Sequence, residues 1–284
     1  MQESQPLQGA LLLGVSALIF ALMGVAIRYA TQSGINNEIV VFSRNLVGVI
    51  FFLPLLLRKG LAPLKTTRLK SHFLRTFSGL AAMYCFFYAI AHLPLADAML
   101  FTYSAPIFTP IIAYFWLKEP LTPRVLVFSA IGLLGVALVA KPSNSLFNSL
   151  SLIGLAASLL AAIAYVSIRQ MSDTEPAYRI VFYFAFFSAL VSAVPLTWAW
   201  QTLTHAQLLW LGLAGLLAAF AQITMSRAYT LAPPSIISPV AYSAIIFAGL
   251  LAWFFWQETP DPLSIGGAVL IISASLMSLF LRKR

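Results

Sequence analysis

The arginine at position 44 is the residue whose type and position most directly suggest chemistry. It lies within "VVFSRNLVGVIFF" (40–52), a run that is otherwise almost entirely apolar. A charged side chain in the middle of a lipid bilayer costs about 2.5–3.5 kcal/mol on insertion scales, so such residues tend to serve function. Arg44 could bind an anionic group of a ligand. It could also be structural, either reaching outward to the lipid headgroups or pairing with Asp97.

Aromatic, hydroxyl and amide side chains supply the other candidate ligand contacts. Tyr84 and Tyr88 lie one helical turn apart, which makes them either a packing feature or a wall on which an aromatic or cationic ligand stacks. Gln222 lies inside an apolar run and can hydrogen-bond a ligand. The candidate substrate-binding residues are Arg44, Tyr84, Tyr88, Tyr103, Ser104, Gln222, Tyr242 and Ser243.

The composition shows what must position these residues. Of 284 residues, 61% are hydrophobic and 9% are charged, and the mean hydropathy is +0.91. A soluble domain has about 45–50% apolar and about 25% charged residues, so an all-α integral membrane protein is predicted. Because a spanning helix needs about 20 mostly apolar residues, ten transmembrane helices are expected, over 9–30, 38–57, 73–92, 95–117, 124–141, 150–170, 178–200, 207–229, 235–256 and 263–281.

The sequence of one of these spans recurs later in the chain. The stretch "TYSAPIFTPIIAYFWLKEP" (102–120) returns 139 residues later as "AYSAIIFAGLLAWFFWQET" (241–259), so that Tyr103 and Glu119 recur as Tyr242 and Glu258. The chain therefore divides into two five-helix halves, 1–145 and 146–284. Because five is odd, the second half enters the membrane from the opposite side. Such inverted repeats are frequent in secondary transporters, where two similar halves exchange conformations.

Prolines interrupt both copies of this span. Proline inside a helix removes a hydrogen bond and clashes with the preceding turn. In a membrane the freed carbonyl must be satisfied by protein or by water in a cavity. Pro106 and Pro110 are expected to kink the span over 95–117, and Pro239 the span over 235–256. The kinks are either static packing features or gating bends that line a central cavity.

The net charge of +9 reflects topology and not nucleic-acid binding. With ten spans and the N-terminus inside, most Lys and Arg residues, Arg75 among them, fall at cytoplasmic ends, as membrane proteins prefer. A multi-pass protein of the inner (plasma) membrane with both termini cytoplasmic is predicted. The single cysteine, Cys85, argues against disulfides and Cys-rich metal sites, and no metal or cofactor is expected.

Two long stretches also carry a family resemblance. The segments "GLAAMYCFFYAIAHLPLADAMLFTYSAPIFTPIIAYFWLKEPL" (79–121) and "MSRAYTLAPPSIISPVAYSAIIFAGLLAWFFWQETPDPLSIGGAVLI" (225–271) resemble the two repeats of the drug/metabolite transporter superfamily, in its EamA-like ten-helix branch. The first half also resembles the sub-branch of riboflavin and S-adenosylmethionine carriers. The resemblance implies a cavity lined by the first, third, fourth, sixth, eighth and ninth spans. The fifth and tenth, 124–141 and 263–281, then lie outside, where a homodimer could form.

One departure from the family pattern concerns the tenth span. Its "IISASLMS" (271–278) has serine and alanine in place of the customary glycine, which leaves open how this helix packs.

Together these features predict a carrier of small organic metabolites that works by alternating access. An enzyme is not expected, because HExxH, GxSxG and facing intramembrane aspartates are all missing from the sequence. A channel or a non-transporting membrane scaffold is the alternative. Within transport, export of a metabolite or drug and uptake of a vitamin or cofactor such as riboflavin or S-adenosylmethionine both stay open. If Arg44 faces the cavity, a substrate with a carboxylate or phosphate is favoured.

Overall fold

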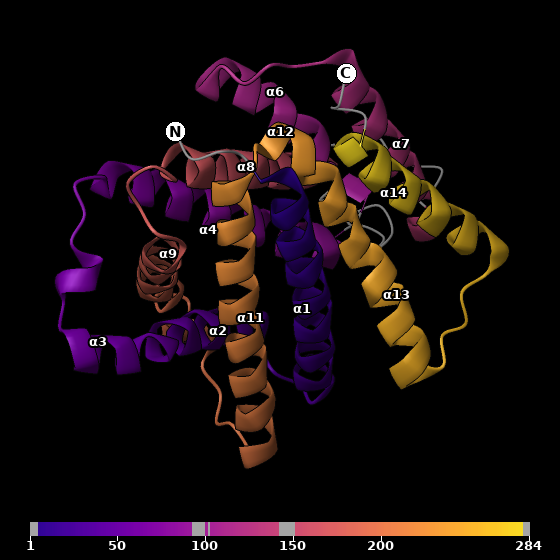
Figure 1. The fold of residues 1–284 in the computed structure, drawn as a ribbon. Helices are drawn as coiled ribbons and strands as arrows, with labels where there is room; N and C mark the ends of the chain where they lie inside the picture. The colour runs from indigo at the N-terminus through magenta and orange to yellow at the C-terminus, as the bar shows by residue number, and fades with distance from the viewer. Residues whose placement is uncertain (1–4, 93–99, 102, 142–150, 281–284) are drawn as a thin grey trace.

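The computed structural model describes residues 5–92, 100, 101, 103–141 and 151–280, and every regular element in this part of the chain is helical (Figure 1). The all-α prediction is therefore confirmed. The elements are α1 (Pro6–Gln32), α2 (Asn37–Phe51), α3 (Leu53–Lys59), η1 (Ala62–Leu64), α4 (Leu69–His92), α6 (Ala105–Leu117), α7 (Pro123–Ala140), α8 (Ser151–Gln170), α9 (Ala177–Ser192), α10 (Leu196–Ala199), α11 (His205–Leu231), α12 (Pro234–Ile237), η2 (Ser238–Tyr242), α13 (Ser243–Trp256) and α14 (Pro262–Phe280).

Length and composition identify several membrane-crossing segments in the described residues. Seven are long and apolar enough: Pro6–Gln32, Asn37–Lys59, Pro123–Ala140, Ser151–Gln170, His205–Leu231, Pro234–Trp256 and Pro262–Leu279. α6 and α9 are apolar but shorter. α4 has 24 residues, but its first two turns carry Lys70, His72 and Arg75. The protein is thus a multi-pass membrane protein, while helix length and composition do not establish the predicted count of ten spans.

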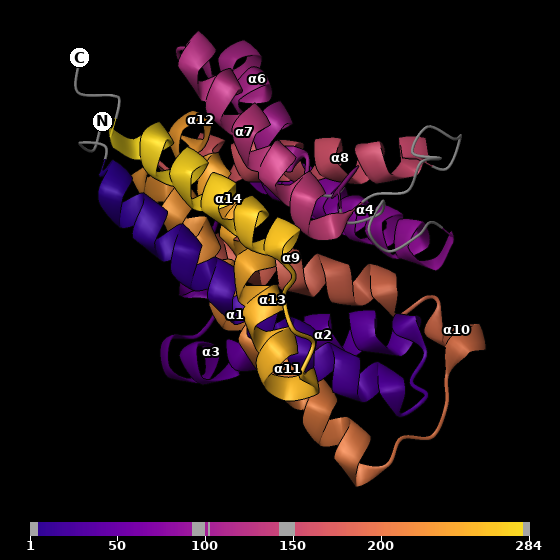
Figure 2. The ribbon, with the colours of Figure 1, turned by 90° about the vertical axis from the view of Figure 1, so that its right-hand side faces the viewer.

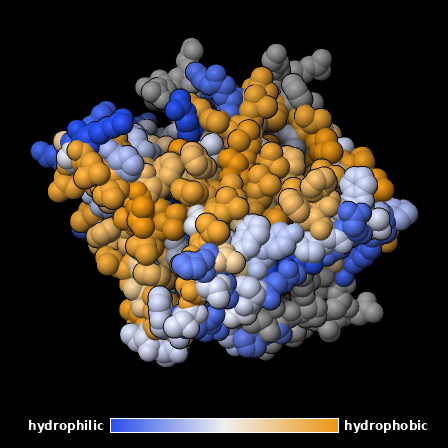
Figure 3. Space-filling model, turned by 90° about the horizontal axis from the view of Figure 1, so that it is seen from below, coloured by the Kyte–Doolittle hydropathy of each residue, from blue (hydrophilic) through white to orange (hydrophobic). Residues whose placement is uncertain are grey.

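The outer surface suits a lipid environment. Large apolar side chains such as Leu57, Leu209 and Phe77 are more than two-thirds exposed. Figure 3 shows broad apolar areas on the face seen from below, bordered by polar side chains. Contact with lipid tails leaves such side chains buried in hydrocarbon instead of exposed to water.

The helices surround a closely packed centre. α1 and α11 lie side by side through the middle of the molecule, α4 packs on α8, and α2 packs against α9 and α11 (Figures 1 and 2). α7 and α14 form a separate pair at one side, as the family resemblance implied. A Cβ atom built on Gly135 would lie 2.6 Å from the carbonyl oxygen of Gly267, so the two backbones touch. The backbone N of Ile271 lies 3.1 Å from the same Cβ position, so the start of the 271–278 stretch also approaches α7 closely.

The two helices related by the 139-residue offset end in the same way. Lys118 after α6 and Gln257 after α13 both adopt left-handed backbone conformations with φ of 57°. The next N–H, of Glu119 and of Glu258, points back to the carbonyl six residues earlier, at 3.3 and 3.4 Å. The N–H groups of Lys118 and Gln257 point to the same two carbonyls, of Ala113 and Ala252, so the two helices share one form of left-handed C-terminal cap. α6 ends at the top of Figure 1 and α13 at the bottom, so the two glutamates lie at opposite ends of the molecule.

One of the three prolines that the sequence predicts to kink a helix, Pro106, has a different position. Pro106 lies in the first turn of α6, where its missing N–H would be unpaired in any case, so it begins a helix instead of kinking one. Pro110 lies inside α6. Pro239 lies in η2, a 3₁₀ segment between α12 and α13 that breaks the expected span over 235–256. Short 3₁₀ stretches within helices often mark hinges.

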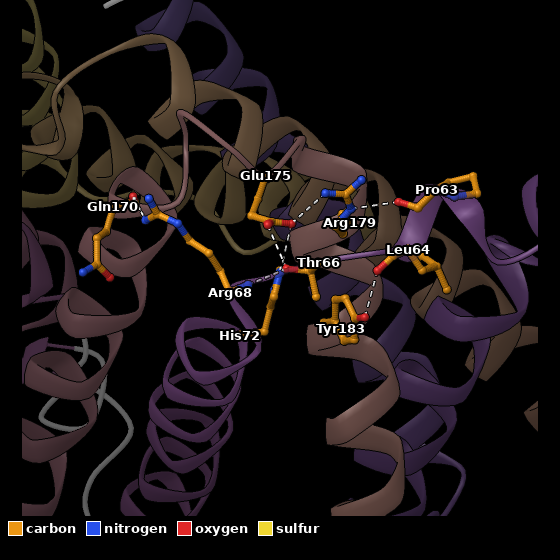
Figure 4. A network of polar contacts seen from close by, with 9 residues as sticks. All are labelled: Pro63, Leu64, Thr66, Arg68, His72, Gln170, Glu175, Arg179 and Tyr183. Carbon is orange, nitrogen blue, oxygen red and sulfur yellow. Dashed lines mark hydrogen bonds and ion pairs between the residues drawn. The ribbon is translucent and has the colours of Figure 1, made fainter.

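A buried polar cluster around Glu175 joins the loop before α4 to the loop between α8 and α9 (Figure 4). The Glu175 side chain is 2% exposed, and its carboxylate accepts hydrogen bonds from Thr66 Oγ1 at 2.8 Å and Arg179 Nη1 at 3.0 Å. His72 Nε2 lies 3.3 Å from the same carboxylate. Arg179 Nε donates to the carbonyl of Pro63 at 2.8 Å. The cluster thereby fixes the start of α4.

Candidate functional site

Two arginines, one from α2 and one from α4, point away from the ends of their helices into the bundle. Arg44 follows the first residue of α2 by seven positions, and Arg75 follows the first residue of α4 by six. Arg75 is 2% exposed and Arg44 is half-buried. The two guanidinium groups lie close enough for their charges to interact. Among the ion pairs formed by the described residues, none includes either arginine.

Arg75 is held by a neutral amide and an aromatic ring. Its Nη2 donates to Gln222 Oε1 at 3.0 Å, and its guanidinium carbon lies 4.2 Å from the ring centre of Phe184. Its Nε has no hydrogen-bond partner in the described part of the chain. Gly79 makes room for the guanidinium, because a Cβ there would collide with Arg75 Nη1. None of these contacts neutralises the charge.

Arg44 has a similarly weak partner. Its Nη1 lies 2.9 Å from the sulfur of Met83, which is a poor hydrogen-bond acceptor. The alternative partner considered from sequence, Asp97, lies outside the described residues. A buried cation without an anion is unfavourable, so the Arg75 charge, on which the Arg44 charge acts, favours the entry of a negatively charged group.

A cavity of about 560 Å³ lies between α2 and α4, and its lining includes the acidic residue Glu38 but neither Arg44 nor Arg75. It is lined by Asn37, Glu38, Val41, Tyr84, Cys85, Tyr88, His92 and Ile153. Arg44 follows Val41 by three positions and so lies on the same face of α2. Small-molecule sites occupy about 300–1,000 Å³, so this cavity has the size of a metabolite site.

Tyr84 and Tyr88 form an aromatic wall of this cavity. The ring of Tyr88 stacks on His92 with centroids 4.0 Å apart, and the ring nitrogen Nδ1 of His92 lies 2.9 Å from the carbonyl oxygen of Tyr88. The hydroxyl of Tyr84 is buried and has no partner in the described residues. The structure thus places Tyr84 and Tyr88 at the cavity, one turn of α2 from Arg44, while Gln222 contacts Arg75.

The remaining candidates make structural contacts. Tyr242 is fully buried, donates from its hydroxyl to the carbonyl of Ser129 at 3.0 Å, and covers Gly132 with its ring. Ser104 and Ser243 donate to carbonyls four and three residues earlier in the chain. Tyr103 is half-buried and packs against the apolar cluster that contains Tyr242. These four side chains lie among packing contacts between helices.

Arg75 was expected at a cytoplasmic helix end, and the structure corrects this to the bundle interior. The reason is that α4 begins at Leu69, four residues before the start expected at 73, so Arg75 lies nearly two turns inside it. A sequence signal existed, because Arg75 is as deep in its helix as Arg44 is in α2. Tyr165 and Tyr229, which stack at 5.2 Å, were also missed, and Tyr165 lies near the Arg75 charge.

Comparison with known families decides what this arrangement belongs to. The model of the EamA-like transporter family matches residues 7–141 and 148–280 of this chain. The chain belongs to this family. The resemblance to the drug/metabolite transporter superfamily is thereby confirmed, and the protein is a multi-pass membrane transporter of small molecules and not an enzyme.

The transporter is similar to proteins of known name along nearly its whole length. It is 32% identical over 272 residues to the pseudopaline exporter of Pseudomonas aeruginosa, covering 94% of each chain. It is 27% identical over 245 residues to the S-adenosylmethionine uptake transporter of Rickettsia bellii, covering 86% of this chain and 84% of the relative. It is 26% identical over 285 residues to the riboflavin transporter of Vibrio cholerae, covering 97% and 94%. One crystal structure matches with a TM-score of 0.84 at 16% identity over 99% of each chain, which supports the fold.

Proposed function

We propose that this transporter carries a small organic anion, which binds through Arg44 and Arg75. The observation that carries the proposal is the Arg75 guanidinium, which is 2% exposed and held only by Gln222 and the Phe184 ring among the described residues. A carboxylate or phosphate between the two arginines would supply charge-assisted hydrogen bonds, which are among the strongest in proteins.

The cavity lining supports an organic ligand over an inorganic ion. Tyr84 and Tyr88 offer ring faces beside the charged group, and the cavity volume of about 560 Å³ exceeds the needs of a simple ion. Two relatives at 26–27% identity are named as transporters of riboflavin and of S-adenosylmethionine. The pseudopaline exporter shares 32% identity with this chain. We therefore favour export of an anionic metabolite, with vitamin or cofactor uptake as the second candidate.

Alternating access between the halves 1–145 and 146–284 is the proposed mechanism. The start of α1 and the end of α14 lie on the same side of the bundle in Figure 2, which fits two cytoplasmic termini in the inner membrane. The outer faces of α7 and α14 expose Leu134, Val269 and Ile265, each more than half exposed. This surface could support a homodimer, and no metal or cofactor forms part of the proposal.

Thermal unfolding of the purified protein against a ligand panel tests the proposed substrate class. The panel contains citrate, glutamate, riboflavin, S-adenosylmethionine, a nucleoside monophosphate and spermidine. A ligand that binds only the folded state at a hundred times its dissociation constant stabilises by about 2.7 kcal/mol. Selective stabilisation by members that carry a carboxylate or phosphate is expected. Stabilisation by spermidine alone would contradict the proposal.

Variants show whether the stabilisation depends on the two arginines. Arg44→Gln and Arg75→Gln should each remove most of the ligand-induced shift. Arg227→Gln is the matched control, because Arg227 lies on α11 near Gln222 but is exposed. An equal loss in the control would show that the effect is a general response to lost charge.

A further inference from the structure

Of the four ion pairs that join the two halves in the described residues, two lie at opposite ends of the molecule and involve the glutamates of the repeat. Arg28 Nη2 in α1 lies 2.7 Å from Glu258 Oε1, which follows α13. Arg169 Nε near the end of α8 lies 3.8 Å from Glu119 Oε1, which follows α6. In each pair the arginine comes from one half of the chain and the glutamate from the other.

The sequence repeat relates these pairs to each other. Glu119 and Glu258 differ by the 139-residue offset and follow identical left-handed caps. Arg28 in "GVAIRY" (24–29) matches Arg169 in "YVSIRQ" (165–170). Exchanging the two halves therefore turns one pair into the other. Two independent surface ion pairs would not need this relationship.

We propose that the two pairs are reciprocal clamps of the transport cycle, each closing the substrate pathway at one end. The inference rests on the alternating-access mechanism proposed above. When Arg28 and Glu258 separate, α1 and α13 can part at their shared end and admit substrate there. When Arg169 and Glu119 separate, α8 and α6 do the same at the other end. Because the halves are equivalent, similar clamps keep the two open states close in free energy.

The surroundings make the two clamps unequal. The first pair is short but exposed, with side-chain exposures of 41% and 53%, and Arg28 also lies 4.1 Å from the ring centre of Trp256. The second is longer but more buried, at 24% and 12%. Ser235 donates to Glu119 at 2.7 Å, and Arg169 donates to the carbonyl of residue 230 at 2.7 Å. These neighbours hold the second pair in place despite its greater length.

The single native cysteine provides a probe for the first clamp. Cys85 lines the cavity beside Asn37, at the start of α2. Only residues 33–36 separate α2 from α1, so this end of the cavity lies on the same side as Arg28. The rate at which a bulky maleimide labels Cys85 in the purified protein therefore reports how far that end is open.

Glutamine variants of the two glutamates should move the labelling rate in opposite directions. Glu258→Gln is expected to raise it by about 1.4- to five-fold, the range for loss of an exposed pair, and Glu119→Gln is expected to lower it. Asp261→Asn is the matched control, because its exposed ion pair with Lys141 joins α7 and α14 away from the cavity. The exchanged pair Arg28→Glu with Glu258→Arg should restore the wild-type rate.

Equal changes of one sign, or none, with an unchanged melting temperature would overturn the clamp proposal. A ligand-induced stabilisation of the wild type that persists in the same preparations would leave the anion-binding proposal intact. If the variants leave the Cys85 labelling rate unchanged and no ligand stabilises the wild type, both the clamp proposal and the anion-binding proposal are contradicted.

Discussion

Removal of the Glu175 carboxylate tests how the loops that fix α4 are held. In Glu175→Ala the side chains of Thr66, His72 and Arg179 lose their shared acceptor in a site where the carboxylate is 2% exposed. Removing one partner of a buried ion pair costs about 3–5 kcal/mol. Arg179 keeps its bond to the Pro63 carbonyl and is 16% exposed, which places the expected loss near the lower limit, about 3 kcal/mol.

Glu175→Gln separates charge from shape. The amide keeps one acceptor oxygen, so a loss of about 1–2 kcal/mol is expected, since hydrogen bonds to charged groups are roughly twice as strong as neutral ones. Equilibrium unfolding in detergent with increasing dodecyl sulfate measures both variants against wild type. A loss below about 1 kcal/mol in Glu175→Ala would refute the view that this cluster anchors the loops.

The same residue gives the stability a pH dependence of defined sign. Burial alone would raise the pKa of Glu175, but the hydrogen bonds from Thr66, Arg179 and His72 outweigh it and lower the pKa. A carboxyl whose pKa falls on folding stabilises above its unfolded pKa of about 4.3. That contribution is lost as the pH falls through the lower folded value. The stability difference between wild type and Glu175→Gln should therefore shrink below about pH 4.5.

Two further substitutions test packing away from the cavity. Gly267→Ala should lower the free energy of unfolding by about 1–3 kcal/mol, because its Cβ would lie 2.5 Å from the carbonyl oxygen of Gly135. Gly266→Ala, where nothing lies within 4 Å, is the control and should be neutral or stabilising. Tyr242→Phe should cost about 1 kcal/mol through its lost bond to Ser129 and leave ligand affinity unchanged, as measured by unfolding with and without the stabilising panel ligand. A lower ligand affinity of Tyr242→Phe would show that Tyr242 takes part in binding.

The sequence predicted the helical elements because apolar runs of spanning length are a strong signal, whereas it placed individual polar residues less well. The start of α4 at Leu69 depends on tertiary contacts of the preceding loop with Glu175, far along the chain, and an error of four residues moved Arg75 from the interior to a helix end. Arg44 is conspicuous in the sequence because the run over 40–52 around it is mostly apolar, and its role in binding stays a prediction.

The sequence repeat indicates which positions of the two halves are equivalent. It identified Tyr103 and Tyr242 as equivalent, but equivalence reflects the shared scaffold, and the Tyr242 hydroxyl is used in a contact between helices. The repeat does not mark Arg75 as part of the shared scaffold, because residue 214, at the same offset of 139, is alanine. The pairing of Arg28 with Glu258 required the fold, because 230 residues separate them.

Transport by the reconstituted protein tests the central claim most directly. Proteoliposomes are loaded with the panel acid that stabilises the protein most, and the accumulation of its labelled form is followed by counterflow. The account predicts saturable accumulation by the wild type and by Arg227→Gln, and little above protein-free vesicles by Arg75→Gln. Equal accumulation by Arg75→Gln and the wild type would contradict the assignment of an anionic substrate to the buried arginines.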